Sequence, residues 1–448
     1  MPEIPSLTAT QSAQMLRSKD LSVLEVIDAH MQHLERVNPA LNAVVDVVEH
    51  VDELARKMDR AHPGADAPPL WGVPVTVKSN VDQIGHANSN GLPALKNNVC
   101  AADTNTPELS LRWFTSNPLH GVTRNPRNLA LTPGGSSGGA AAAVAAGIGT
   151  IGHGNDLGGS LRYPAFCCGV ASIKPSMGRV PAYNPSAVAE RPPITAAMSV
   201  QGPIARNIAD VRLGLNALAR RSVLDPMWTN AVHSRRSDNT PVRDGYSKDL
   251  YADGPNDAAI TKSMNDALGA FRTAGIETVE IDMPRADRAV ALWGELLFAE
   301  TELMMGDLIN SSTSPAFKQM YSGYVDAYSR LDFASYIAGC SERAGIRRDV
   351  AALFDEVDLF LMPTSMSVPF ENDYDFKCPE KLPEIIAAQR PLQLVNFLGL
   401  PSVALPTGMT SDIPVGVQLM GPMHSDAFVL DVAEVLEGEL GTLGLAQI

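Results

Sequence analysis

Two segments rich in glycine and serine are the part of the sequence best suited to chemistry. They are residues 133–139 (PGGSSGG) and 154–162 (GNDLGGSLR). Glycines let a backbone approach a substrate closely, and successive free N–H groups can stabilise the oxyanion that forms during acyl transfer. A serine beside such groups can act as a nucleophile when a base removes its proton. The two segments therefore indicate acyl transfer through a serine.

A flexible linker is the commoner use of Gly/Ser runs, and two features argue against it here. The first run leads directly into the alanine-rich residues 140–146, which predict a helix that positions the N–H groups of the loop. The second run carries Asp156, Ser160 and Arg162 among its glycines. A linker does not need these side chains.

Other motifs for nucleophiles and phosphates fit the sequence less well. Residues 134–138 formally match the G-x-S-x-G elbow of α/β-hydrolases, but a Thr-Pro pair precedes them where that elbow needs an apolar strand. A Ser–His pair would have to use His153, His233 or His424, none of which lies in a telling setting. A phosphate-binding loop needs Gly-Lys-Ser/Thr, and that tripeptide is absent from the sequence.

The elements that must position these residues alternate between helices and short apolar strands, which predicts an α/β class with a central sheet. Residues 71–77 form a short β-branched run that ends at Lys78. Residues 399–406 and 414–420 predict two late strands, and residues 292–340 are mostly helical in pattern. Near the N-terminus, capping boxes at residues 8–11 and 22–25 predict two helix starts. We expect Asn38-Pro39 to end the second of these helices.

Composition narrows the class of protein. The chain has 448 residues, of which 45% are hydrophobic and 19% charged, as in soluble globular proteins. A net charge of -15 makes binding to nucleic acid or to an anionic membrane unfavourable. No run approaches 18 uninterrupted apolar residues, so no membrane span is expected. The five cysteines are odd in number and irregularly spaced, which is typical of reduced thiols in a cytoplasmic protein.

Residues 134–145 and 152–165 together resemble the signature of the amidase signature family. Further blocks of that family are matched in the expected order, namely 71–78, 104–108, 173–179, 201–206, 399–401 and 416–422. The resemblance implies the amidase signature fold, in which helices flank a mixed central β-sheet on both faces. It also implies a single domain over 1–448, with an N-terminal helical segment (1–62), a catalytic core (70–210) and a second half (211–448) containing a helical insert and the closing strands.

The same resemblance implies a Ser–cis-Ser–Lys triad with an acyl-enzyme intermediate. Ser160 is the nucleophile, Ser136 is the bridging serine in a cis peptide, and Lys78 is the base. An ammonium cannot accept a proton, so Lys78 must be neutral, and burial at the end of an apolar strand favours the neutral form. The other implied site residues fall into three groups: the oxyanion hole (Leu157, Gly158 and Gly159, with the Ser160 N–H), the supporting residues (Ser137, Asp156 and Arg162, the last two as a buried pair), and the substrate pocket (Trp113, Phe114 and Tyr163).

The leading hypothesis is hydrolysis of a small-molecule amide, with carbamates (urethanes) and activated esters as further substrates. The alternatives are a glutaminase-type subunit of a tRNA-dependent amidotransferase, which would need a stable partner, and a catalytically weak or non-catalytic family member. We expect no cofactor and no metal, because His30 and His33 stand at i, i+3 without partner ligands. The resemblance suggests a homodimer. The exact substrate and its leaving group stay open.

The sequence departs from the family pattern at two places. A helix and a strand expected before Thr104 are not found next to Asp103, and residues 238–253 are polar where a strand should open the second half. Both changes would remove elements of the sheet, which exposes unpaired edges and apolar surface. We therefore expect a sheet shortened near Asp103 and near Asp238, with reduced stability or activity.

Overall fold

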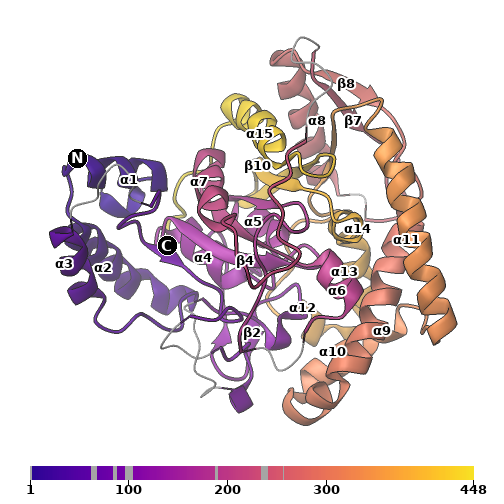
Figure 1. Ribbon diagram of the computed structural model, residues 1–448, viewed down its shortest axis with the longest axis horizontal. Helices are drawn as coiled ribbons and strands as arrows, with labels where there is room; N and C mark the ends of the chain where they lie inside the picture. The colour runs from indigo at the N-terminus through magenta and orange to yellow at the C-terminus, as the bar shows by residue number, and fades with distance from the viewer. Residues whose placement is uncertain are drawn as a thin grey trace.

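A nine-stranded mixed sheet forms the centre of the molecule (Figure 1). The computed structural model describes residues 3–61, 68–83, 88–95, 104–186, 190–233, 241–255 and 257–448. Across the sheet, the strands run in the order β1 (Val75–Thr76), β4 (Ile151–Asp156), β6 (Val200–Ala205), β5 (Ala171–Lys174), β10 (Ser402–Thr410), β11 (Ile413–Met420), β9 (Leu359–Pro363), β7 (Arg243–Tyr246) and β8 (Glu277–Glu280). A separate two-stranded sheet consists of β2 (Ser116–Asn117) and β3 (Gly121–Val122).

The strands pair in both directions. β1 is parallel to β4, and β7 is parallel to both β8 and β9. The central strands from β4 through β6, β5, β10 and β11 to β9 pair antiparallel. The two late strands predicted from apolar patterning are β10 and β11, which form an antiparallel hairpin with one register shift between Pro406 and Gly408.

Helices cover both faces of the sheet. They are α1 (Ala9–Ser18), α2 (Val23–Leu41), α3 (Val51–Arg60), α4 (Gly138–Ala146), α5 (Arg162–Cys168), α6 (Pro193–Met198), α7 (Ile208–Leu218), α8 (Ala258–Thr273), α9 (Ala286–Ser312), α10 (Pro315–Asp326), α11 (Phe333–Leu353), α12 (Tyr374–Lys377), α13 (Leu382–Ala388), α14 (Arg390–Leu398) and α15 (Asp426–Leu440). Helices α7, α8 and α15 share one apolar core with the sheet. Helices α4, α5, α9 and α14 lie on the opposite face. This arrangement confirms the predicted α/β class.

The two ends of the sheet carry different helices. Helices α1 to α3 lie beside the β1 end, at the left of Figure 1, and the long helices α9 and α11 lie at the right. The predicted helical pattern of residues 292–340 corresponds to α9, α10 and the start of α11. None of the described helices is both long and apolar enough to cross a membrane.

Helix α4 packs unusually close to the sheet because its residues are small. Its alanines are buried on every side. A Cβ atom added at Gly152 of β4 would lie 3.1 Å from the Cβ of Ala140, and one added at Gly139 would lie 2.5 Å from the backbone nitrogen of Asn105. The helix that follows the first Gly/Ser run is therefore held in place by packing on all sides, and so is the loop that enters it.

The predicted helix starts at residues 8 and 22 are confirmed. Thr8 and Ser22 cap α1 and α2, each in a complete capping box with the residue three positions later. The predicted end at Asn38-Pro39 was wrong, because α2 contains Pro39 and continues to Leu41. The Asn38 side chain binds the N–H groups of Ala43 and Val44, which stabilises the turn beyond the proline.

The two expected losses from the sheet have different outcomes. Residues 96–103, next to Asp103, lie outside the described part of the chain. The expectation of a lost strand within residues 238–253 was wrong, since β7 occupies Arg243–Tyr246 and pairs with β8 and β9. Backbone hydrogen bonds to two neighbours form this strand, and polar side chains do not prevent them.

The polar character of β7 leaves one side chain in an unfavourable place. Asp244 is fully buried, and neither of its carboxyl oxygens has a hydrogen-bond partner among the described residues. Burial raises the pKa of this carboxyl well above its ordinary value of 3.8. A buried polar group without a partner typically destabilises the folded state by about 1–3 kcal/mol.

We expect Asp244→Leu to raise the free energy of unfolding at neutral pH by about 1–3 kcal/mol. The folded-state pKa of Asp244 is raised, so its contribution to stability is complete below the unfolded-state pKa near 3.8 and is lost as the pH rises toward the folded-state pKa. The gap between the variant and the native chain should therefore widen above about pH 4. Urea unfolding at several pH values measures it.

Asp249→Leu is the matched control, because Asp249 is an exposed aspartate shortly after the same strand. Its effect should stay within about 0.5 kcal/mol. A stability of Asp244→Leu equal to that of the native chain at pH 8 would show that the buried carboxyl does not destabilise the fold.

Candidate active site

Lys78 lies in the interior of the protein, two residues beyond β1, and is fully buried. Its amine Nζ donates to Ser136 Oγ at 2.7 Å and to Asn155 Oδ1 at 2.6 Å. Burial lowers the pKa of Lys78 well below its ordinary value of 10.5, and the negative charge of Asp156 opposes this shift only in part. The environment therefore favours a neutral amine, which can accept a proton.

The loop before α4 places Ser136 against Lys78. Gly134 has a positive φ of 78°, and a Cβ atom there would lie 2.7 Å from the Cα of Pro164. A Cβ atom on Gly135 would lie 2.5 Å from the backbone nitrogen of Phe114, and the Gly135–Ser136 peptide bond is cis. Only glycine fits these two positions. Thr106 Oγ1 donates to the Ser136 carbonyl at 3.0 Å and holds the loop in place.

The carboxylate of Asp156 organises the loop that carries Ser160. It accepts hydrogen bonds from the N–H groups of Gly159 (2.8 Å) and Leu161 (3.1 Å). Ser160 lies between these two residues and is 8% exposed. The same carboxylate therefore fixes the backbone on both sides of the serine.

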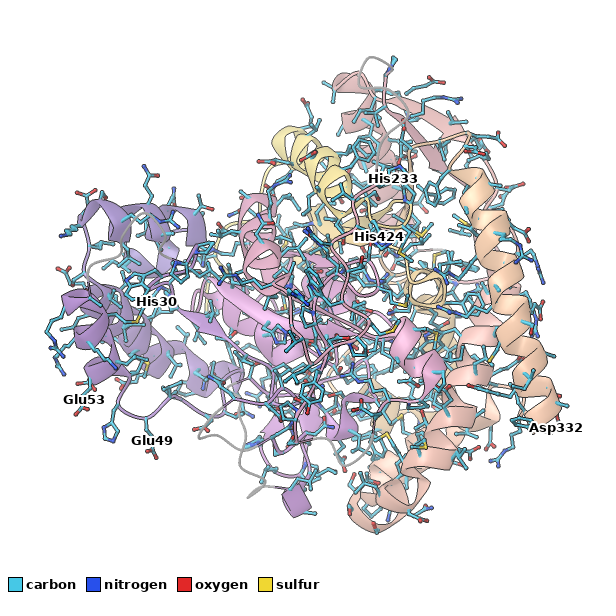
Figure 2. The ribbon with its side chains drawn as sticks, viewed as in Figure 1. His30, Glu49, Glu53, His233, Asp332 and His424 are labelled. Atoms are coloured by element: carbon cyan, nitrogen blue, oxygen red, sulfur yellow. The ribbon has the colours of Figure 1, made fainter. Side chains whose placement is uncertain are left out.

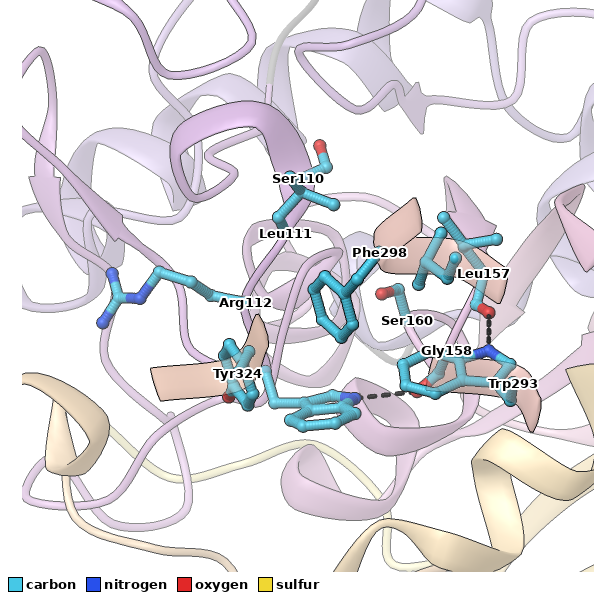
Figure 3. A pocket seen from close by; sticks show the side chains of 11 residues that line it. Ser110, Leu111, Arg112, Leu157, Gly158, Ser160, Trp293, Phe298 and Tyr324 are labelled. Atoms are coloured by element: carbon cyan, nitrogen blue, oxygen red, sulfur yellow. Dashed lines mark hydrogen bonds between the residues drawn. The ribbon is translucent and has the colours of Figure 1, made fainter. Parts of the chain in front are cut away.

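Two indole rings hold the carbonyl groups of this loop. Trp293 Nε1 donates to the Leu157 carbonyl at 3.0 Å, and Trp113 Nε1 donates to the Gly158 carbonyl at 2.7 Å (Figure 3). In a trans peptide the carbonyl and the next N–H point in opposite directions. The indole of Trp293 therefore directs the Gly158 N–H away from itself.

A buried ion pair supports the loop from behind. Arg162 and Asp156 are fully buried and lie 3.0 Å apart. Arg162 also donates to Gln418 Oε1 of β11 at 2.7 Å and to Asn396 Oδ1 of α14 at 2.6 Å. Burial acts to raise the pKa of Asp156, but the Arg162 charge outweighs it and lowers that pKa to about 2. Asp156 is therefore charged at neutral pH.

A cavity with mostly aromatic walls opens beside Ser160 (Figure 3). Its aromatic residues are Trp113, Trp293, Phe298 and Tyr324, and Leu111, Leu157 and Leu297 also line it. The Trp113 and Trp293 rings stack with centroids 6.3 Å apart, and Phe298 stacks on Tyr324 at 6.2 Å. These ring contacts make the walls of the cavity rigid.

The charged residue of this cavity, Arg112, is already neutralised. Its guanidinium is buried, binds Asp375 at 2.7 Å and Asp373 at 2.9 Å, and points away from Ser160 in Figure 3. Within the described residues, the cavity lining therefore offers no unpaired charge. Such a cavity suits an uncharged aromatic group.

The structure brings most of the predicted site residues together. Lys78 and Ser136 are in contact, and Ser137 Oγ donates to the Asn155 carbonyl at 3.4 Å. Trp113 lines the cavity, but Phe114 and Tyr163 do not; they are fully buried and contact Phe370 and Phe166, respectively. No hydrogen bond between Ser136 and Ser160 is present among those of the described residues.

Sequence reasoning missed Asn155, Trp293, Phe298 and Tyr324. Asn155 stands within the second Gly/Ser segment, directly before Asp156, so its position was a usable signal. The three aromatic residues lie on α9 and α10, more than 130 positions beyond Ser160, where their pattern resembles that of any helix core.

The histidines considered as alternative bases are elsewhere engaged or unsuited. His233 and His424 adjoin each other, with the His233 N–H donating to the His424 carbonyl at 3.0 Å (Figure 2). Burial lowers the pKa of His153 to about 4, and the charge of Lys78 adds to that shift. His30 lies on α2, where its ring binds the carbonyls of Gly147 and Ile148. The described residues contain no group of three or more His, Cys, Asp or Glu side chains suited to a metal ion.

Comparisons with known proteins extend over nearly the whole chain. A family model described as Amidase matches residues 25–103 and 98–430. An indoleacetamide hydrolase from Bradyrhizobium diazoefficiens is 37% identical, and the alignment covers 97% of this chain and 87% of that protein. A component of the glutamyl-tRNA(Gln) amidotransferase of Caldanaerobacter subterraneus subsp. tengcongensis is 27% identical, covering 97% and 96%. The crystal structure of a bacterial aryl acylamidase belonging to the amidase signature enzymes is 25% identical with a TM-score of 0.82, covering 97% and 96%.

We expect Arg162→Met to lower the free energy of unfolding by about 3–5 kcal/mol, because it leaves the Asp156 charge buried without its partner. In the native chain the lowered pKa of Asp156 contributes stability that is present above its ordinary pKa of 3.8 and is lost as the pH falls through about 2. Without Arg162 that pKa rises, so the loss should begin at higher pH. Chemical unfolding between pH 3 and pH 8 measures both effects.

Arg212→Met provides the control, because Arg212 pairs with Asp431 on the surface at 2.8 Å. Its cost should stay below about 1 kcal/mol. Equal costs for the two variants would contradict a supporting role for the buried pair.

Proposed function

Because this chain belongs to the amidase signature family and is a hydrolase of C–N bonds, we propose that it hydrolyses an uncharged arylacetamide through an acyl-enzyme on Ser160. One observation carries the proposal. Ser160 lies at the wall of an aromatic cavity, in the same signature whose buried Lys78 contacts Ser136 at 2.7 Å. The similarity to an indoleacetamide hydrolase supports an acyl group of this kind.

The proposed reaction begins with proton transfer. Neutral Lys78 takes the Ser136 proton while Ser136 takes the proton of Ser160, and Ser160 Oγ attacks the amide carbonyl carbon. Hydrogen bonds between catalytic groups are often long before substrate binds, so we expect the Ser136–Ser160 contact to form in the complex. The proton then passes back through Ser136 to the amide nitrogen, the C–N bond breaks, and ammonia or an amine leaves.

The acyl-enzyme is hydrolysed by the reverse use of the same groups. Water loses a proton toward Ser136 and Lys78, attacks the ester carbonyl, and releases the carboxylic acid as Ser160 regains its proton. We assign the oxyanion hole to the N–H groups of Leu157, Gly158 and Ser160. The Gly159 N–H is less available, because it donates to Asp156 at 2.8 Å.

The uncharged cavity also supports an arylacetamide over glutamine. Glutamine carries an ammonium and a carboxylate, and each needs a charged or strongly polar partner when buried. Arg112, the one charged residue among the described lining, is already bound to Asp375 and Asp373. Aryl carbamates and activated aryl esters present the same acyl-transfer geometry, so we include them as further substrates.

The first prediction for this proposal concerns the triad. Ser160→Ala should lower kcat/KM for indole-3-acetamide by about 10³-fold or more, because no acyl-enzyme can form. Lys78→Met and Ser136→Ala should each lower it by about 10²-fold or more. Ammonia release from a panel of an arylacetamide, an anilide, an aryl carbamate and an aryl ester measures activity and ranks the leaving groups.

Ser137→Ala serves as the neighbouring-serine control, since Ser137 makes a single long hydrogen bond to the Asn155 carbonyl. Its loss should stay below about tenfold. If glutamine is turned over and no panel member is, the result would point to the glutaminase-type alternative. A folded native chain that turns over none of them would point to a non-catalytic member.

The second prediction concerns the cavity. Phe298→Ala should raise KM for the arylacetamide by about tenfold, because the ring that stacks on Tyr324 is lost from the wall. The effect on acetamide, which lacks an aromatic group, should be within about twofold. Phe333→Ala is the control, since Phe333 is 80% exposed on α11. Equal changes for both substrates would contradict an aryl subsite.

A further inference from the structure

Asn155 contacts the amine of Lys78 directly. Its Oδ1 lies 2.6 Å from Nζ, and Ser136 Oγ lies 2.7 Å from the same atom. These two oxygens are the hydrogen-bond partners of Nζ among the described side chains. The buried amine is therefore held between one amide and one hydroxyl.

The two partners differ in what they can do. An amide carbonyl oxygen accepts hydrogen bonds and cannot donate, whereas a hydroxyl does both. A neutral amine has two N–H groups and one lone pair. The contact with Asn155 uses one of those N–H groups, so the lone pair cannot face Asn155. It can face Ser136, whose O–H can donate to it.

We propose that Asn155 is a positioning residue that holds one N–H of Lys78 and so directs the lone pair of the amine toward Ser136. The inference rests on the proposed function, in which Lys78 is the base. Asn155 touches neither the substrate nor the reacting atoms of Ser160. It acts through Lys78.

The backbone around Asn155 is rigid enough for this role. Asn155 belongs to β4, where it pairs with Gln201 of the antiparallel neighbour β6. Its carbonyl accepts a hydrogen bond from Ser137 Oγ at 3.4 Å. The next residue, Asp156, is fixed by the ion pair with Arg162. The amide oxygen is therefore presented to Lys78 from a central strand of the sheet.

An amide suits this place better than a carboxylate because it carries no charge. The titratable groups that act on Lys78 in the described structure are Asp156 and His153, both on β4. Their pKa values are lowered to about 2 and about 4, so neither changes charge near neutral pH. Asn155 orients the amine without adding a negative charge that would favour the ammonium.

Two substitutions separate orientation from charge. Asn155→Leu removes the acceptor at nearly constant volume, and Asn155→Asp keeps the acceptor while adding a charge. Asn155→Leu should lower kcat for the arylacetamide by about 10- to 100-fold with KM within about twofold. Asn155→Asp should move the acidic limb of the kcat/KM–pH profile to higher pH by about one unit or more, because the carboxylate stabilises the ammonium form of Lys78.

The matched control is Gln201→Glu. It makes the same amide-to-carboxylate change at the cross-strand neighbour, which has no hydrogen bond to Lys78 among those of the described residues. Its pH profile should move by less than about a third of the shift caused by Asn155→Asp.

A second readout does not depend on turnover. The titration of Lys78 can be followed by NMR of protein labelled with [ε-¹³C]lysine, with Lys78→Met identifying its signal. The midpoint should rise in Asn155→Asp and stay in place in Gln201→Glu. Equal midpoints in Asn155→Asp and the native chain, or native kcat in Asn155→Leu, would overturn the inference. If the native chain hydrolyses no panel member, the proposed function fails, and the titration still decides whether Asn155 governs this amine.

Discussion

The buried ion pair between Asp156 and Arg162 is the interaction on which the site depends. It joins the loop of Ser160 to α5, and through Arg162 it reaches α14 and β11. Two charges in the interior must stay paired, because the desolvation cost of a single one is large. The pair can therefore not open locally, and the backbone that Asp156 holds on both sides of Ser160 cannot drift away from the sheet.

The same pair also allows a charged and a neutral group to lie close together. The Asp156 charge would favour the ammonium form of Lys78 if it were free. Arg162 neutralises most of that charge locally, so burial remains the dominant influence on Lys78 and lowers its pKa. The partners of the amine, Ser136 and Asn155, are uncharged. A base is produced here by excluding water and charge from the lysine.

The substrate cavity joins segments that are far apart along the chain. Trp113 and Trp293 hold adjacent carbonyls of the Ser160 loop and also form its aromatic wall. A single pair of side chains thus shapes the loop and contacts the acyl group. The geometry of the proposed oxyanion hole and the choice of substrate are therefore coupled, because a change in either indole alters both.

The sequence by itself determined the features that depend on neighbouring residues. The capping boxes of α1 and α2 are local hydrogen bonds, the hairpin of β10 and β11 follows from apolar runs, and the glycines, serines and lysine of the signature indicate the chemistry. Only the tertiary structure decided which distant residues meet. Lys78 contacts Asn155 across 77 positions and Trp293 contacts Leu157 across 136. Such contacts follow from the order of strands and the packing of helices on the sheet, which no local pattern encodes. The strand β7 shows the same limit, because pairing with two neighbours formed it in spite of its polar residues.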